Sequence, residues 1–349
     1  MINIEGIPGR TAYVNGKEFL FFSGFAYLGM TSMPEFSQLI LEGAQKYGAV
    51  FPSSRISNTR SGLYEEFEER LSKFLGLQAS ASFSSGYMAS QAAASFSAQH
   101  SRLLYSPGIH PSLYIQGHQI LTTEGWKENI IHEVNDKDKE AFTIVMESVN
   151  PLTGEVHDFS WLNKIKNPVR LLIDDSHGMG VLGDGGKGII SSLPKQSNIR
   201  YLICYSLAKA FSCEGGAISG EEGDIETIKK MSHFTAATGM SPVFIYAWNK
   251  SADLFGKQLA LLKENIFSFD KKMENIPFVH HDSKLPSYRI QEAALYDYCL
   301  QYHILLSAFR YPSEKDPLMA RIVLNASHTE EDLERLSDCI HEFYKTMKN

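Results

Sequence analysis

The stretch LLIDDSHGMGVLGDGGKG, residues 171–188, runs from an apolar segment into two acids and a histidine. Its first residues belong to the run Val169–Ile173, which is compact and rich in branched side chains. Phe142–Met146 and Tyr201–Tyr205 have the same character. Runs of this kind are typical of strands buried on both faces of a largely parallel sheet. Because helical stretches lie between them, we predict an α/β fold for the middle of the chain.

Polar residues follow each of the three runs. Glu147 comes after the first run and Asp174 after the second. Ser206 comes after the third run, with Lys209 three residues further on. In open α/β sheets, ligands bind beyond the carboxyl ends of the strands. We therefore expect these side chains to converge on one active site.

Helical patterns frame the apolar runs. Between Ser61 and Gly76, apolar residues recur at helical spacing, and Gly76 is placed to end the helix. Thr329 and Asp332 form a capping-box pattern, with Asp in place of the usual Glu, before an amphipathic C-terminal helix. Residues 240–269 also have a helical pattern.

The pattern then changes to a mixed segment, with strand candidates near residues 284–290 and 321–324. We therefore place a small domain at the end of the chain. The predicted organisation is an N-terminal segment, a large domain and a small C-terminal domain, over residues 1–35, 36–255 and 256–349.

Composition and charge narrow the class of protein. The 349 residues carry a formal net charge of -7, whereas proteins that bind nucleic acid through its phosphates have an excess of Lys and Arg. No apolar run approaches the ~20 residues that a membrane helix needs, and the N-terminus has no signal-peptide pattern. The four cysteines have neither zinc-site nor redox spacing. We expect a cytoplasmic protein with no metal centre, no nucleic-acid partner and no membrane span.

Two further segments carry features of an anion site and a reactive lysine. FSSGYMAS, residues 83–90, has a strand end, a Ser-Gly turn and a predicted helix, whose first N–H groups would face an anion. Taken alone, it fits an ordinary strand-to-helix turn better. YSLAKAFSCEGGAISG, residues 205–220, places Lys209 among small residues, where Gly215 and Gly216 allow close backbone approach. Taken alone, Lys209 fits a solvated surface lysine.

Asp174 has two interpretations. An acid at the end of a buried strand suits a pyridinium nitrogen, which it keeps protonated. The alternative is an Asp that caps its own loop. His177 follows within the same loop, where a lone histidine is more often structural. Combined with a lysine that can form a Schiff base, these residues favour pyridoxal 5'-phosphate (PLP) as the cofactor.

Together these segments resemble the α-oxoamine synthase family of fold-type I PLP enzymes, from about Gly16 to the C-terminus. The other stretches that carry the resemblance are YLGM, SSRISNTRSGLYEEFEERLSKFLG and RIVLNASHTEEDLERL, at residues 27–30, 53–76 and 321–336. The resemblance implies an aspartate aminotransferase-like fold. In that fold a large domain has a mostly parallel sheet of the seven-stranded type, and a smaller C-terminal domain is α+β. It also implies a homodimer with shared active sites.

The resemblance assigns catalytic roles to four matching positions. Lys209 would hold PLP as a Schiff base and move the α-proton, and Asp174 would pair with the pyridine nitrogen. His177 would contact the ring hydroxyl, and His110, in SPGIHPSLY, would stack on the ring.

The same resemblance implies a phosphate site. Ser85, Gly86 and Tyr87 would hold the phosphate by their turn. Ser206 would add its hydroxyl, and Thr238 of a neighbouring subunit would complete the site.

The resemblance also implies a reaction. Arg321 would pair with the carboxylate of an amino acid. The amino acid condenses with an acyl thioester, on CoA or a carrier protein, with release of the thiol, and decarboxylation then gives an aminoketone. Members that join L-alanine to a pimeloyl thioester in biotin synthesis match best. Phe25 stands where the family usually has Asn, and Pro151 where it commonly has Ser. Two alternatives therefore stay open: a class I/II aminotransferase, and a partner subunit that has lost catalysis.

Overall fold

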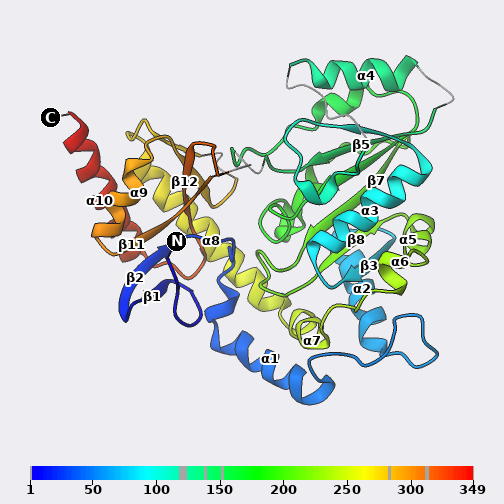
Figure 1. Ribbon diagram of the computed structural model, residues 1–349, viewed down its shortest axis with the longest axis horizontal. Coiled ribbons are helices and arrows are strands. Elements are labelled where there is room, and N and C mark those ends of the chain that lie inside the picture. The colour runs from blue at the N-terminus through cyan, green and yellow to red at the C-terminus, as the bar shows by residue number, and fades with distance from the viewer. Residues whose placement is uncertain are drawn as a thin grey trace.

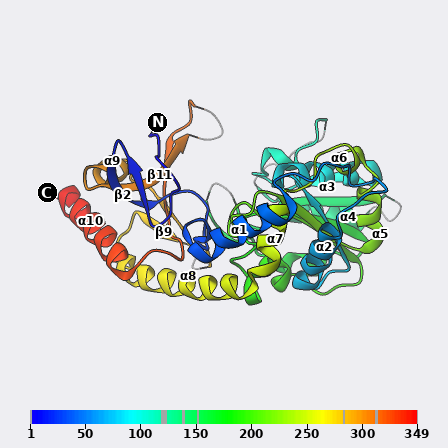
Figure 2. The same ribbon diagram turned by 90° about the horizontal axis from the view of Figure 1, so that it is seen from below.

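The structure is a computed structural model that describes residues 2–117, 124–136, 140–150, 153–281, 284–310 and 314–348. The chain forms a large and a small lobe, and the long helix α8 (Ala252–Met273) crosses from one to the other (Figure 1). Each lobe contains a six-stranded sheet among these residues. The first strands and the last helix of the chain lie together in the small lobe (Figure 2).

The large lobe is built on a mostly parallel sheet with the order β3-β8-β7-β6-β5-β4. Strands β4 to β7 run parallel, and β8 is antiparallel to both β7 and β3. The strands are β3 (Ala79–Phe83), β4 (Arg102–Tyr105), β5 (Phe142–Glu147), β6 (Val169–Asp174), β7 (Ile199–Ser206) and β8 (Gly216–Gly220). The described residues thus give this sheet six strands, where the resemblance implies the seven-stranded type. The three apolar runs are β5, β6 and β7, as predicted.

Both faces of the large sheet are buried. Leu171 and Leu172 are neighbours in β6, yet they belong to two different apolar clusters, one on each face. This is why the strand sequences are continuously apolar and do not alternate. The helices that pack around this lobe are α1 (Pro34–Tyr47), α2 (Gly62–Leu75), α3 (Gly86–His100), α4 (Trp126–Asp136), α5 (Glu222–Ile228), α6 (Ser232–Thr235) and α7 (Pro242–Lys250).

The predicted helix ends of α2 and of the last helix, α10 (Glu330–Lys348), are confirmed. The side chain of Ser61 accepts the N–H of Leu63, and Gly76 ends α2 with a φ of 71°. At α10, the N–H of Thr329 donates to Asp332 Oδ2 at 2.9 Å, and the N–H of Asp332 donates to Thr329 Oγ1 at 3.3 Å. These reciprocal bonds are those of a capping box.

The small lobe has a second sheet with the order β1-β2-β11-β12-β10-β9. Its elements are β1 (Thr11–Val14), β2 (Lys17–Phe22), β9 (Val279–His281), β10 (Ser287–Ile290), α9 (Ala294–Gln301), β11 (Ile304–Arg310), β12 (Leu318–Val323) and α10. Because β2 pairs in parallel with β11, the N-terminal strands share a sheet with the last strands of the chain. The domain limits at residues 35 and 255 stay a prediction.

The helical pattern over residues 240–269 belongs to two helices, α7 and α8, that meet at Ser251. The backbone of Ser251 leaves the helical region, with φ of -103° and ψ of 10°, and its buried hydroxyl donates to the carbonyl of Ala247 at 2.6 Å. The apolar pattern continues across this break, so periodicity alone indicates a single helix. Within the described ranges, no helix is both long and apolar enough to cross a membrane.

Candidate active site

The strand ends of the large sheet meet at a cavity of about 180 Å³. Glu147, Asp174 and Ser206 are the last residues of β5, β6 and β7, and all three line this cavity. We call it the cofactor cavity. Its lining is Gly86, Tyr87, Ser90, His110, Ser112, Glu147, Asp174, Ser176, His177, Ser206 and Lys209. The structure thus brings Lys209 and the three strand-end residues together.

Asp174 is the most firmly held acid of the cavity. Only 5% of the residue is exposed. Its Oδ1 accepts the backbone N–H of Ser176 at 2.9 Å, and its Oδ2 accepts the hydroxyl of Ser90, from α3, at 3.0 Å. One bond comes from its own loop and one from a packed helix, so the carboxylate has a fixed orientation at the end of β6.

Glu147 lies beside Asp174 on the neighbouring strand, where the register pairs the two residues. Burial and the charge of Asp174 raise the pKa of Glu147 well above its usual range. Its Oε1 accepts the backbone N–H of His110 at 2.8 Å. Burial also raises the pKa of Asp175, the residue after β6, to about 7. Because the pKa values of Glu147 and Asp175 are raised, these two carboxyls and Asp174 do not all carry a full negative charge.

Lys209 lies in the turn between β7 and β8, where its carbonyl accepts the N–H of Ser212 at 3.1 Å. Burial lowers the pKa of Lys209, and the nearby charges of Asp174 and Glu147 act against that shift. A lowered pKa increases the share of uncharged amine, which is the nucleophilic form.

His177 forms a hydrogen bond with Tyr27, whose hydroxyl lies 2.8 Å from His177 Nδ1. Burial raises the pKa of Tyr27. Burial, with the positive charges of Lys209 and Arg321, lowers the pKa of His177 well below its usual range. We therefore assign a neutral His177, whose Nδ1 accepts the hydroxyl of Tyr27 and whose Nε2 carries the ring proton.

His110 follows β4 and lines the cavity with an exposed side chain. Its Nδ1 lies 2.7 Å from Ser112 Oγ and accepts the N–H of Ser112 at 3.2 Å. Loss of solvent around the ring lowers the pKa of His110. The ring is thus held by the 3₁₀ turn η2 (Pro111–Leu113) that it caps.

The first turn of α3 packs directly against the end of β7. A Cβ added at Gly86 would lie 2.6 Å from the Cβ of Ser206, and one added at Gly216 would lie 2.5 Å from the Cα of Gly86. Only glycine allows this approach. Ser85 is the N-cap of α3, and its hydroxyl accepts the N–H of Met88 at 3.1 Å. The N-terminus of α3 and Ser206 therefore lie at one end of the cofactor cavity, which favours an anion there.

Arg321 lies outside the cofactor cavity, in β12 of the small lobe. It lines a smaller cavity with Tyr27 and His177, and His177 lines both cavities. Its guanidinium carbon lies 5.1 Å from the centre of the Phe309 ring. His177 is therefore the residue through which the two cavities adjoin.

Two of the other predicted positions also lie elsewhere. Thr238 is exposed in the loop before α7 and does not line the cofactor cavity of its own chain. Phe25 is 49% exposed and lines neither cavity. Pro151 lies outside the described residues.

Sequence reasoning gave no role to four residues that the structure places at the site: Tyr27, Ser90, Ser112 and Ser176. Ser90 lies one helical turn after Gly86, so helical spacing indicates that it faces the same way. Ser176 follows Asp174 at the spacing of an Asx turn. The only signal for Tyr27 was its place in the YLGM stretch.

The family model for aminotransferase class I and II matches residues 44–340. The chain belongs to that family. It is 26% identical to the 8-amino-7-oxononanoate synthase of Nitrosomonas eutropha, over 97% of this chain and 93% of that one. Serine palmitoyltransferase of Sphingomonas wittichii has a TM-score of 0.83 at 17% identity, covering 98% of this chain and 92% of that chain. 8-Amino-7-oxononanoate synthase of Francisella tularensis has a TM-score of 0.74 at 22% identity, covering 95% and 99%. The expected fold and the resemblance to α-oxoamine synthases are confirmed.

The donors of the cofactor cavity fit the parts of PLP. Asp174 suits the pyridine nitrogen, and Lys209 suits the aldehyde carbon. The N-terminus of α3, where no Cβ fits at Gly86, suits the phosphate. The residues present are therefore those that this cofactor requires.

Proposed function

We propose that this protein is a PLP-dependent acyltransferase that condenses an amino acid with an acyl thioester, releases the free thiol, and loses the substrate carboxylate as CO2 to give an aminoketone. The observation that carries the proposal is that Asp174, Lys209 and the N-terminus of α3 line one cavity. Relatives at 26% identity are 8-amino-7-oxononanoate synthases. We therefore propose L-alanine and a pimeloyl thioester as the substrates.

Four side chains prepare the reaction centre. PLP, when bound, supplies an electron sink for the charge left at the α-carbon. Lys209 would hold the cofactor and would then move the α-proton. Asp174 would keep a proton on the pyridine nitrogen, because Ser90 and the backbone of Ser176 fix its carboxylate. His177 would donate its Nε2–H to the ring hydroxyl.

The remaining residues orient the reactants. His110 would cover one face of the ring and leave the other to Lys209, so that the proton would move on one side only. Arg321 binds the substrate carboxylate, since a planar guanidinium suits two parallel hydrogen bonds. Its small cavity adjoins the cofactor cavity at His177.

We also propose a homodimer, located in the cytoplasm. Thr238 is exposed and lies away from its own cofactor cavity, which suits a residue that serves a second copy. Tyr87 lines the cavity and is still 58% exposed, so the phosphate end is open on the side that a partner would cover.

An aminotransferase is the second candidate, and Phe25 favours it. A phenylalanine cannot donate a hydrogen bond to the substrate, whereas the Asn usual in the α-oxoamine synthases can. Arg321 would then hold the carboxylate with less help.

One experiment separates the two candidates. PLP-loaded protein is incubated with L-alanine, the alanine is removed, and PLP and pyridoxamine phosphate are quantified by chromatography. We expect PLP to persist after the alanine is removed, and free thiol, CO2 and an aminoketone to form once L-alanine and pimeloyl-CoA are added together. Accumulation of pyridoxamine phosphate that returns to PLP only with a keto acid would replace the acyltransferase by an aminotransferase.

A further inference from the structure

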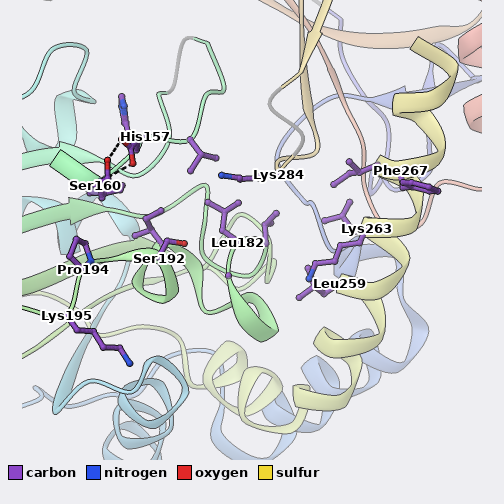
Figure 3. A pocket seen from close by; sticks show the side chains of 18 of the residues that line it. His157, Ser160, Leu182, Ser192, Pro194, Lys195, Leu259, Lys263, Phe267 and Lys284 are labelled. Carbon is purple, nitrogen blue, oxygen red and sulfur yellow. Dashed lines mark hydrogen bonds between the residues drawn. The ribbon is translucent and has the colours of Figure 1, made fainter. Parts of the chain in front are cut away.

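A second, larger cavity lies between α8 and the connections that follow β5 and β6 (Figure 3). Its volume is about 870 Å³, within the range of small-molecule sites. We call it the α8 cavity. None of its lining residues lines the cofactor cavity or the small cavity at Arg321. The α8 cavity is therefore distinct from the two cavities of the site described above.

The α8 cavity has apolar side chains on two opposite walls, among polar ones. Leu259, Leu262 and Ile266 recur at helical spacing on the face of α8 that lines it. Phe267 lies beside them and is 62% exposed. Leu182 lies across the cavity from α8 (Figure 3). A hydrocarbon body placed here would contact apolar side chains from both sides.

Three exposed lysines line the same cavity: Lys195, Lys263 and Lys284. Lys263 comes from α8, and Lys284 from the connection between β9 and β10. Lysines with a direct ion pair within the described ranges include Lys73, Lys229, Lys272 and Lys345, and none of these lines the cavity. Within the described ranges, the α8 cavity thus holds three ammonium groups that no carboxylate neutralises by direct pairing.

The two carboxylates of the α8 cavity are engaged elsewhere. Asp158 accepts the N–H and the hydroxyl of Ser160, and these bonds lower the pKa of Asp158 more than the charge of Lys284 does. Asp270 accepts the hydroxyl of Tyr288 at 2.9 Å and lies 2.7 Å from His281 Nδ1. Both acids are therefore used in contacts of the protein itself, whereas the lysines face the cavity or solvent.

We propose that the α8 cavity binds an amphipathic carboxylate, such as a medium-chain fatty acid. The hydrocarbon chain lies between Leu182 and the apolar face of α8. The carboxylate lies at Lys263 and Lys284. The charge complementarity is local, because the chain as a whole carries a net charge of -7 and would repel an anion from most of its surface.

The test is a calorimetric titration of PLP-loaded protein with sodium decanoate. We expect one molecule per chain, and weaker binding of 1-decanol, which lacks the charge. The Lys263→Glu/Lys284→Glu double variant should weaken decanoate binding by about tenfold or more, because it places two carboxylates where the anion binds. Lys257→Glu reverses one charge on α8 outside the cavity, half the charge change of the double variant, and it should change the affinity by less than about twofold.

Three outcomes would overturn the proposal: no binding to the unmodified protein, equal binding to the double variant, or equal binding of decanol and decanoate. Loss of decanoate binding in Arg321→Ala alone would also overturn it, because the fatty acid would then occupy the substrate site. The lysines are exposed, so the PLP absorbance of the double variant should match that of the unmodified protein. An unchanged PLP absorbance would show that the cofactor site is intact, so a loss of decanoate binding could not be attributed to a failure of the proposed acyltransferase site.

Discussion

The parallel strands of the large sheet end together, whereas most strands of the small sheet alternate in direction. Three strand ends of the large sheet therefore bring Glu147, Asp174 and Ser206 to one cavity. From the small sheet, Arg321 comes near this site from within β12. Parallel pairing gathers functional groups because the carboxyl ends share one edge of the sheet. In an antiparallel sheet, neighbouring strands end at opposite edges, so the polar residues at their ends do not meet at one site.

Two histidines show the same contrast. Burial lowers the pKa of both His177 and His328, so both are neutral at pH 7. His177 uses Nδ1 for Tyr27, and its Nε2–H is left for the cofactor cavity. His328, at the end of the small sheet, accepts the N–H of Asn325 at Nδ1 and donates from Nε2 to the carbonyl of Phe21. The first is placed for chemistry and the second for packing.

Lys209→Ala should have the largest effect on activity. The variant loses the covalent attachment of PLP and the group that moves the α-proton, so aminoketone formation should fall by at least about 10³-fold. Borohydride reduction followed by mass spectrometry should find PLP attached to the unmodified protein and not to the variant. Lys250→Ala, an exposed lysine at the end of α7, is the control and should keep both properties. An attached cofactor in Lys209→Ala would show that another lysine holds it.

Arg321→Lys should have the next largest effect and tests what the small sheet contributes. A lysine keeps the charge and loses the two parallel hydrogen bonds, so the KM for L-alanine should rise by about tenfold or more, with a smaller change in kcat. Arg289→Lys makes the same change at the cross-strand neighbour in β10, which lines neither cavity. Equal effects of the two substitutions would mean that Arg321 acts only through the packing of the sheet.

The sequence predicted best what depends on local pattern or on parallel pairing. The buried strands were predictable because β6 must be apolar on both faces, and Asp174 because it ends such a strand. The break at Ser251 depends on the backbone conformation of one residue, and the spacing of the apolar residues does not reveal it. The bond between Tyr27 and His177 depends on how the N-terminal segment packs against a distant loop, for which no local signal exists.

Tyr27→Phe should lower activity by about tenfold or less, the value of one hydrogen bond, because only the support of His177 is lost. The hydroxyl of Tyr27 stabilises the neutral imidazole by donating to Nδ1, so its removal should raise the pKa of His177. The acid limb of the kcat profile should therefore move to higher pH. Tyr13→Phe, at an exposed position of β1, should leave the profile unchanged. A lower rate with an unshifted profile would assign Tyr27 a packing role only.

His328→Gln should have the smallest effect on activity at pH 7 and a distinct effect on stability. In the folded chain, burial lowers the pKa of His328 to about 4, and in the unfolded chain the usual value is about 6.5. Above that pH both states are neutral, and His328 adds no pH dependence. As the pH falls from about 6.5 to about 4, the unfolded chain takes up a proton that the folded chain does not, so the free energy of unfolding decreases.

This titration should account for about 2 kcal/mol of the stability that the protein loses between pH 7 and pH 5. Denaturant unfolding at both pH values measures the loss, and His328→Gln should reduce it by that amount. Any cost of the substitution that is independent of pH cancels in the difference. An equal loss in both proteins would mean that the folded chain protonates His328 as readily as the unfolded chain does. His328 and His177 would then differ in charge at low pH as well as in the residues that they contact.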